Sequence, residues 1–471
     1  MKRYRLRRLL IAGVVVMVSV FAVAALFARG AAEEVDGDVT VQIILWPGPE
    51  SDAFESVANH WNSEIGPEKG IYVSVVLFGR DQMHLRQEAI MAAGSSEVDV
   101  FQIGSVRYGR YLPFLEPLDE YIENPETNPW GASPDNFMSG VMSPYYYRDQ
   151  LMGVPRDVSV HYLYYRRDLI EELLENEEWQ ELYREISAEY VGEALDPKDP
   201  DDWTWDDYLA AAYFFTQEYN PDSPTEYGTF THGRVMGPTG FLWTNAYWGY
   251  GGDWYDDDGN VVFDTDAARE ALRIWHTKFD QGLTPPGSVT GEYPEANEAM
   301  LAGQVAMGVH WNAAYSTVIE TEDSPMQGKF GIVAPPAGPE GRFSYNHSLG
   351  YALNPNSRHK EQTAIFLTWL FTDEANQIYG EAGGIPPVED ILAGLTDLRP
   401  DFDVMAGVLG RYGRALPPQT GAIEVMAAEY LSDAWTGSVD FDTALSGLQR
   451  EAQREIDQVM ADIEAGELAA D

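Results

Sequence analysis

Aromatic and polar side chains stand together at several points where apolar runs of the sequence end. An indole ring packs well against apolar C–H faces, and carboxylate, amide and guanidinium groups around it supply hydrogen-bond acceptors and donors. This combination suits the reversible binding of a polyhydroxylated molecule. The residues that fit this pattern are Trp46, Asp52, Arg80, Asp81, Asp157, Trp243, Asn245 and Trp248.

Structural roles for the same residues stay open at the level of sequence. Trp46 is equally consistent with a core position. Asp81 would cap a helix, and Asp157 would cap the turn that precedes it. The aromatic, glycine-rich loop around Trp248 would pack beneath a hairpin over 253–262, although its glycines would also let the backbone approach a ligand closely.

Signatures of common enzymes are missing from the sequence. It contains no G-x-S-x-G, H-E-x-x-H or P-loop motif. It also contains no cysteine, which excludes disulfides, thiolate metal sites and a cysteine nucleophile. We expect a protein that performs no chemistry and needs no cofactor or metal. A secreted glycosidase stays open as the alternative, because abundant acids can always place two carboxylates near a cleft.

The elements that would position these residues alternate along the chain. Apolar runs predict strands over 39–46, 70–78 and 98–104, with helices up to about residue 64 and over 81–93 between them. This order predicts parallel pairing and an α/β layered fold. Further helices are expected over 169–194, 267–281, 359–380 and 438–463, and further strands at 305–311 and from Leu349.

One strand has an unusual composition. After a Gly-x-Pro turn, the stretch GVPRDVSVHYLYYRRDL over 153–169 carries an apolar or aromatic residue at every second position from Val158 to Tyr164. Proline- and glycine-rich stretches elsewhere are too short to isolate a domain. We therefore expect two α/β regions that are joined by strands crossing between them, with this stretch as the first such strand.

The N-terminus predicts export from the cytoplasm. Five basic residues between Lys2 and Arg8 precede an apolar run over 9–28, and small residues follow. This pattern predicts a signal peptide over 1–32, with an uncleaved membrane anchor as the alternative. Either outcome implies a periplasmic or extracellular protein.

The negative charge of the chain argues against anionic partners. The formal net charge is −46, and removal of the signal would leave 24 basic against 76 acidic side chains. Nucleic acid and anionic lipid need a basic face, so neither is expected as a partner. The acids are dispersed along the chain, which indicates a solvated acidic surface.

In the order of its segments, the sequence resembles the extracellular solute-binding proteins of ABC importers, specifically the carbohydrate-binding family 1. The resemblance covers nearly the whole chain after the signal. Each motif is weak by itself, and nine occur in order with family-like spacing. Among them are VDVFQIG, LEPLDEYI, GVPRDVSVHYLYYRRDL, DDWTWDDYLAAA, AMLAGQVAMGVHW and LGYALNPNSRHK. The chain has Arg166 where family members often have asparagine.

The resemblance implies a two-lobed periplasmic-binding-protein-like fold of type II, with discontinuous lobes and a hinge. One lobe would comprise 39–152 and 346–400, and the other 153–345 and 401–471. A monomer would capture a sugar or oligosaccharide between the lobes and deliver it to the permease subunits of the importer. A clamp for a non-sugar solute such as a polyamine shares this fold and is the second alternative.

The resemblance also adds positions to the site. Family members line their cleft with residues in four places. These are the end of the third strand, the end of the 305–311 strand, the start of the second strand that crosses between the lobes, and a glycine-containing loop. The corresponding residues in this chain are Gln102, Ser105, Trp311, Asn312, Tyr345, His347, Gly383 and Gly384. Because Arg80 is the one basic candidate, a phosphorylated ligand is disfavoured.

Overall fold

A single nine-stranded mixed sheet runs through the protein. The computed structural model describes residues 38–319 and 324–466, so the predicted signal peptide lies outside the described residues. The main path of the sheet has the order β2-β1-β3-β10-β6-β8-β7, with β11 on β10 and β9 on β6. Its strands are β1 (Val39–Leu45), β2 (Ile71–Leu77), β3 (Val100–Gly104), β6 (Val154–Arg166), β7 (Tyr227–Thr229), β8 (Val305–Trp311), β9 (Phe330–Val333), β10 (Ser344–Leu353) and β11 (Gly413–Arg414).

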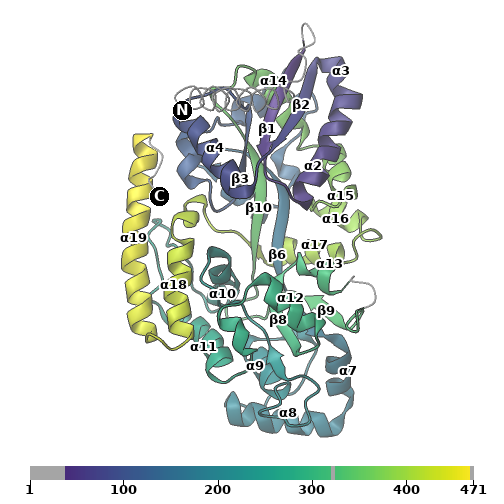
Figure 1. The fold of residues 1–471 in the computed structure, drawn as a ribbon, viewed down its shortest axis with the longest axis vertical. Helices are drawn as coiled ribbons and strands as arrows, with labels where there is room; N and C mark the ends of the chain where they lie inside the picture. Colours follow the sequence, from purple (N-terminus) through teal and green to yellow (C-terminus); the bar gives the residue numbers. More distant parts are fainter. Residues whose placement is uncertain (1–37, 320–323, 467–471) are drawn as a thin grey trace, which may run out of the picture.

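Helices cover the sheet on both sides (Figure 1). The upper part of the molecule carries α2 (Pro49–His60), α3 (Gly66–Lys69), α4 (Arg80–Ala92), α5 (Asp119–Glu123), α6 (Ser139–Met142), α14 (Lys360–Trp369), α15 (Asp373–Glu381) and α16 (Glu389–Gly394). The lower part carries α7 (Arg167–Glu175), α8 (Glu177–Tyr190), α9 (Trp205–Phe214), α10 (Gly237–Gly249), α11 (Asp266–Asp280), α12 (Tyr293–Leu301) and α13 (Ala314–Val318). The chain ends with α17 (Asp401–Tyr412), α18 (Glu424–Trp435) and α19 (Phe441–Ala465).

The upper part confirms the predicted parallel arrangement. Strand β1 pairs in parallel with β2 along its whole length and with β3 on its other side. Parallel neighbours need a crossover connection, which α2 and α4 provide. The carboxyl ends of β1 and β3 therefore point the same way, toward the middle of the molecule, where ligands of open α/β sheets bind.

Two long strands, β6 and β10, connect the upper and lower parts (Figure 1). The first half of β6 pairs with β10, and its second half pairs with β8 and β9. Strand β10 in turn pairs with β3 in the upper part. The strand predicted after Pro155 is thus confirmed, and β10 begins at Ser344, five residues before the expected Leu349.

The stretch expected to be an aromatic loop is instead the helix α10 (Gly237–Gly249). Its helical pattern is hidden because nearly every residue is buried, so no polar face marks the period of the helix. Pro238 occupies the first turn, where proline is tolerated. The helix packs against α11 and α18 in the core of the lower part.

Two predicted helices are each divided by a capping residue. Asn176 separates α7 from α8, and its side chain accepts hydrogen bonds from Glu178 N and Trp179 N. Thr372 separates α14 from α15, and its hydroxyl accepts from Ala375 N at 3.3 Å. A side-chain cap marks the start of a new helix. Each of the two long periodic patterns therefore forms two helices in place of one.

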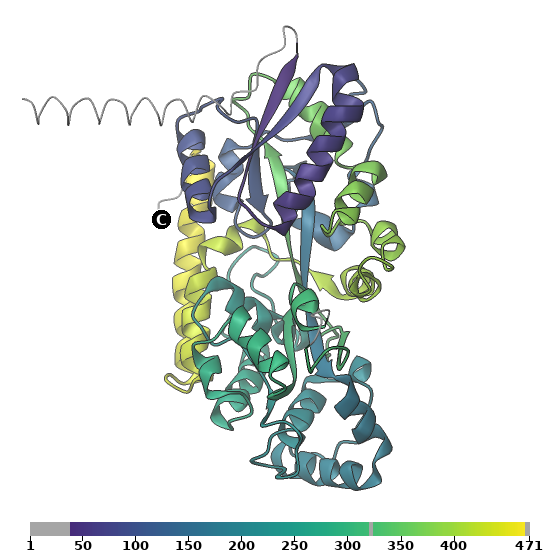
Figure 2. The same cartoon turned by 45° about the vertical axis from the view of Figure 1, so that its right-hand side comes forward.

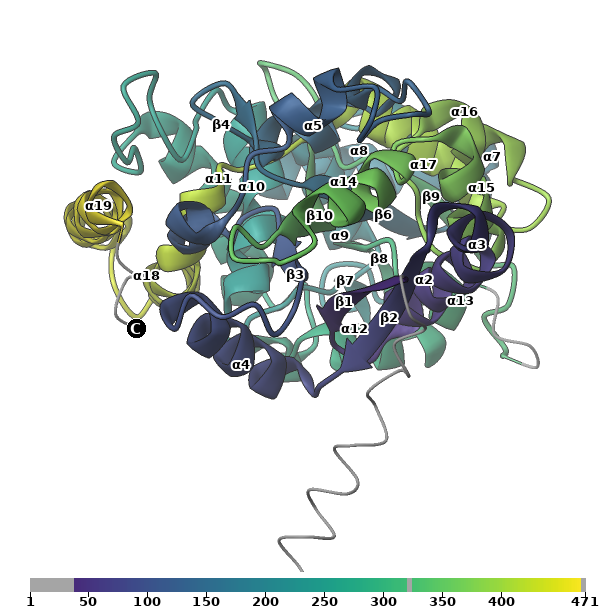
Figure 3. The ribbon, with the colours of Figure 1, turned by 90° about the horizontal axis from the view of Figure 1, so that it is seen from above.

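The C-terminal helices lie beside both parts of the molecule. Figures 1 and 2 show α19 running along one side, and Figure 3 places α18 and α19 together at the periphery. Helix α19 packs on α18 and also on the 3-10 helix Gly109–Phe114 of the upper part. Within the described ranges, no helix is both long and apolar enough to cross a membrane.

Candidate ligand-binding cleft

A cavity of about 550 Å³ lies where the two parts meet. Its walls come from the carboxyl ends of β1 and β3, from the crossing strands β6 and β10, and from the lower strand β8. A volume of this size is typical of small-molecule sites. Seven residues singled out from the sequence line it: Trp46, Gln102, Asp157, Trp311, Asn312, His347 and Gly383.

The upper wall is built around Trp46. Its backbone N–H donates to the Gln102 side-chain oxygen at 3.2 Å, and its carbonyl accepts from the Ser51 hydroxyl at 2.6 Å. The indole N–H donates to Glu50, which also lines the cavity. Only 7% of Trp46 is exposed. These contacts hold the ring in one orientation, with a small apolar surface left toward the cleft.

The lower wall is built around Trp311, the last residue of β8. The His161 ring packs against it nearly at right angles, with the ring centroids 4.2 Å apart. Asn245 fixes His161 through a 2.9 Å hydrogen bond to Nδ1. Burial lowers the pKa of His161 to about 3, so this support is uncharged at neutral pH. Trp311 itself is partly exposed and offers a flat apolar face to the cavity.

Asn312 follows directly in the same wall. Its side-chain oxygen accepts from Val160 N at 2.9 Å. The amide nitrogen is buried and has no hydrogen-bond partner among residues 38–319 and 324–466. An unpaired buried donor is costly, and a ligand hydroxyl or carbonyl at the cavity surface would satisfy it.

Asp157 holds a loop of the cleft wall in place. Its carboxylate accepts from the Tyr379 hydroxyl at 2.8 Å and from Ile385 N at 3.0 Å. Gly383, in the same loop, has φ +95 and no side chain to block the cavity. Burial raises the pKa of Asp157 to about 6, although the Tyr379 and Ile385 hydrogen bonds favour its charged form.

This raised pKa predicts a pH-dependent stability. An unfolded aspartate has a pKa near 3.9, so the folded protein holds the proton more tightly. The contribution of Asp157 to the free energy of unfolding should therefore fall as pH rises through about 4 to 6. We expect the Asp157→Asn variant to gain about 1 kcal/mol relative to the parent between pH 5 and pH 7.5. Urea unfolding at both pH values measures this gain; a constant difference would contradict it.

Charged side chains in the cleft have partners within the protein. Arg107 pairs with Glu424. The Arg399 guanidinium makes two 2.9 Å contacts to Asp401, and Glu292 pairs with Arg234 at 3.0 Å. The basic cleft residues are thus Arg107 and Arg399, which the sequence did not single out. Because their charges are compensated, the cleft does not require an anionic ligand.

Five other predicted residues are buried and do not line the cavity. Asn245, Trp243 and Trp248 are buried in α10, within the lower core. Tyr345 is also fully buried: its N–H donates to the Asn245 oxygen at 2.7 Å, and its ring packs on Trp311. Ser105 is buried as well and contacts His347 Nδ1 at 3.1 Å. Asn245, Tyr345 and Ser105 support residues of the cleft from behind.

The remaining predicted residues have other positions. Gly384 packs against Tyr379, where a Cβ would lie 2.3 Å from the ring. Asp52 is exposed in the first turn of α2, away from the cavity. The side chains of Arg80 and Asp81, at the start of α4, lie outside the described residues. Neither Asp52 nor Gly384 lines the cavity.

Several cleft residues were missed by sequence reasoning. They are Glu50, His84, Arg107, Tyr111, His232, Tyr293 and Arg399. Arg107 follows the third strand by three residues, and this position at a strand end was a usable signal. Tyr293, at the start of α12, and Arg399, in a loop before α17, carry no local mark of their place.

An open α/β sheet with two crossing strands and a shared aromatic cleft defines the class of proteins that capture small molecules between two lobes. The chain belongs to the bacterial extracellular solute-binding protein family, whose model matches residues 48–377. Membership implies a periplasmic or extracellular location. The family consists of binding proteins rather than enzymes.

Individual relatives agree with this assignment. The arabinooligosaccharide-binding protein of Halalkalibacterium halodurans is 23% identical over 382 residues, covering 76% of this chain and 74% of the relative. Maltose-bound MalE3 of T. maritima has 20% identity and a TM-score of 0.65, with 88% of this chain and 98% of that chain covered. The cyclic alpha-maltosyl-1,6-maltose binding protein from Arthrobacter globiformis has 16% identity and a TM-score of 0.69, with 89% and 99% covered. The fold class expected from the sequence is confirmed.

Proposed function

We propose that this protein captures a neutral sugar or oligosaccharide between Trp46 and Trp311 and delivers it to the permease subunits of an ABC importer. The ligand would leave unchanged, since the protein's part is binding and release. A cleaved signal peptide over 1–32 would export it, and it would act as a monomer.

One observation carries the proposal: the cleft combines aromatic rings from both parts of the molecule with arginine charges that are already compensated. Trp46 and Tyr111 come from the upper part, and Phe241, Tyr293 and Trp311 come from the lower part. Aromatic faces match the C–H faces of a sugar ring. The polar groups between them, including the unpaired Asn312 amide, match its hydroxyls. The carbohydrates named for the relative and the two solved structures agree with this chemistry.

Closure of two lobes around the ligand follows from the same geometry. We assign 39–152 and 346–400 to one lobe and 153–345 and 401–471 to the other, with β6 and β10 as the connections between them. A ligand that touches both tryptophans binds the closed arrangement more tightly than an open one. It therefore shifts the population toward closure by its differential affinity.

A thermal-shift screen tests the proposal. Neutral mono- and oligosaccharides, spermidine and inorganic phosphate would each be added to the protein without its N-terminal 32 residues. A ligand at one hundred times its Kd adds about 2.7 kcal/mol to the free energy of unfolding, so at least one carbohydrate should raise Tm. A shift produced only by spermidine or phosphate would contradict the proposal, and cleavage of the bound carbohydrate would favour a glycosidase.

A further inference from the structure

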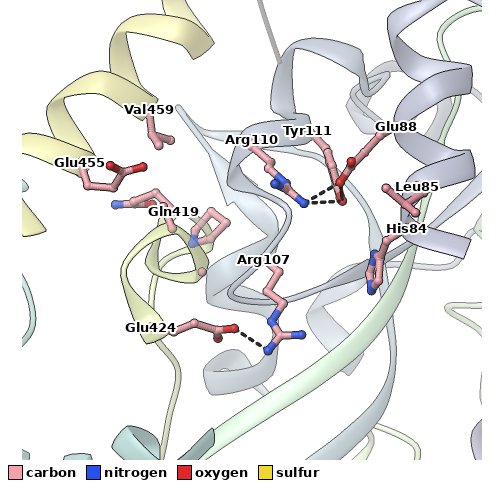
Figure 4. Close-up of a pocket in the computed structure, with 13 residues that line it drawn as sticks. His84, Leu85, Glu88, Arg107, Arg110, Tyr111, Gln419, Glu424, Glu455 and Val459 are labelled. Atoms are coloured by element: carbon pink, nitrogen blue, oxygen red, sulfur yellow. Dashed lines mark hydrogen bonds and ion pairs between the residues drawn. The ribbon is translucent and has the colours of Figure 1, made fainter. Parts of the chain in front are cut away.

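A second chamber of about 660 Å³ opens beside the cleft. It shares His84, Arg107 and Tyr111 with the first cavity, so the two spaces meet along these side chains. Figure 4 shows its walls: His84, Leu85 and Glu88 from α4 on one side, and Gln419, Glu424 and Glu455 from the C-terminal segment on the other. The C-terminal helices thus cover the lower core and also form one wall of a space that adjoins the cleft.

The chamber has the mixed lining of a sugar site. Leu85 is 66% exposed, the largest exposed fraction among the large apolar side chains described. It faces the chamber together with Pro418 and Val459. One polar cluster in the chamber is compensated: the Glu88 carboxylate accepts from Arg110 at 2.5 Å and from the Tyr111 hydroxyl at 2.7 Å. The charges of Glu88 and Arg110 therefore balance each other and do not call for an ionic ligand.

One polar atom in the wall is unsatisfied. Glu424 is 4% exposed, and one of its carboxylate oxygens pairs with Arg107. The other oxygen is buried without a hydrogen-bond partner in the described part of the chain. A buried charged acceptor without a partner is costly. Because Glu424 lines the chamber and not the cleft, a ligand hydroxyl that reaches this carboxylate would lie in the chamber.

We propose that the cleft and the chamber form one elongated site that takes an oligosaccharide of three or more sugar units. This inference rests on the proposed function. One end of the ligand lies between Trp46 and Trp311, and the other passes Arg107 and donates a hydroxyl to Glu424. Each space alone has the volume of an ordinary small-molecule site, and a monosaccharide would fill less than one of them.

Calorimetry with ligands of increasing length tests the inference. Arabino-oligosaccharides and malto-oligosaccharides of one to six units would be titrated into the parent and into three variants. Leu85→Trp and Ala422→Trp fill the chamber from opposite walls, and Leu174→Trp adds the same ring at an exposed position on α7 as a matched control. Leu85 is exposed, so its variant should fold even if the Ala422 variant does not.

We expect the affinity of the parent to rise at least tenfold from the disaccharide to the tetrasaccharide. Both filling variants should lose this gain and keep the disaccharide affinity, while the control keeps both. Binding of mono- and disaccharides with no gain for longer chains would overturn the extended site and leave the proposed function intact. Failure of every neutral carbohydrate to bind would overturn both.

Discussion

Replacing Trp311 with alanine should weaken ligand binding by about 1–3 kcal/mol, which is roughly a 5- to 150-fold rise in Kd. The substitution removes a flat apolar face from the lower wall of the cleft. It leaves the backbone of β8 paired with β6, and Trp311 is only partly buried, so the fold should persist. Calorimetry with the carbohydrate found in the screen measures the change.

Trp248 provides the matched control for this prediction. It is 1% exposed and packs against Phe343 and Tyr345 in the lower core. Its replacement by alanine should lower the free energy of unfolding by about 3–5 kcal/mol, the usual cost of deleting a buried aromatic ring. Unchanged affinity in the Trp311 variant, or a larger loss of stability there than in the Trp248 variant, would contradict the assignment of Trp311 to the site.

Replacing Arg156 with alanine should lower the free energy of unfolding by about 3 kcal/mol. Arg156 is fully buried in β6. Its guanidinium donates to Ala375 O at 3.0 Å and stacks 4.1 Å over the Tyr379 ring. The variant would leave a cavity and would remove hydrogen bonds from the Ala375 carbonyl and the Asn376 side-chain oxygen. Relief of the desolvation of a buried charge offsets part of this cost, which is why we expect 3 kcal/mol and not more.

The same variant should also weaken ligand binding. Arg156 stacks on the Tyr379 ring, and the Tyr379 hydroxyl donates to the Asp157 carboxylate. The same carboxylate accepts from Ile385 N, in the loop that contains Gly383 of the cleft wall. Urea unfolding and calorimetry would be compared with Arg86→Ala, a variant of an exposed arginine on α4 whose surface ion pair with Glu97 should be worth 1 kcal/mol or less. If the two variants lose equal stability, the buried network does not support the cleft.

The place of Trp46 at the edge of the sheet, beside the cavity, could be predicted from the sequence because the information is local. Trp46 directly follows β1, a strand that an apolar run identifies, and parallel strands bring their carboxyl ends to one edge of the sheet. Gln102, in the parallel strand β3, came from the resemblance to the family. Asp157 was found because the alternating aromatic strand after it had to cross between two cores. The positions of Trp311 and His347 came from the resemblance to the family, and the cavity includes both.

The sequence by itself thus determined the strands, their parallel order, the joining of two parts by β6 and the family. Only the tertiary structure decided that α10 is a buried helix and that Arg107 and Arg399 reach the cleft. It also placed the C-terminal helices around a second chamber. The physical reason is the distance along the chain over which information is needed. Hydrophobic periodicity is local and shows which face of a single segment is buried. The lining of a cavity depends on how segments hundreds of residues apart pack together, as Arg107 and Glu424 do.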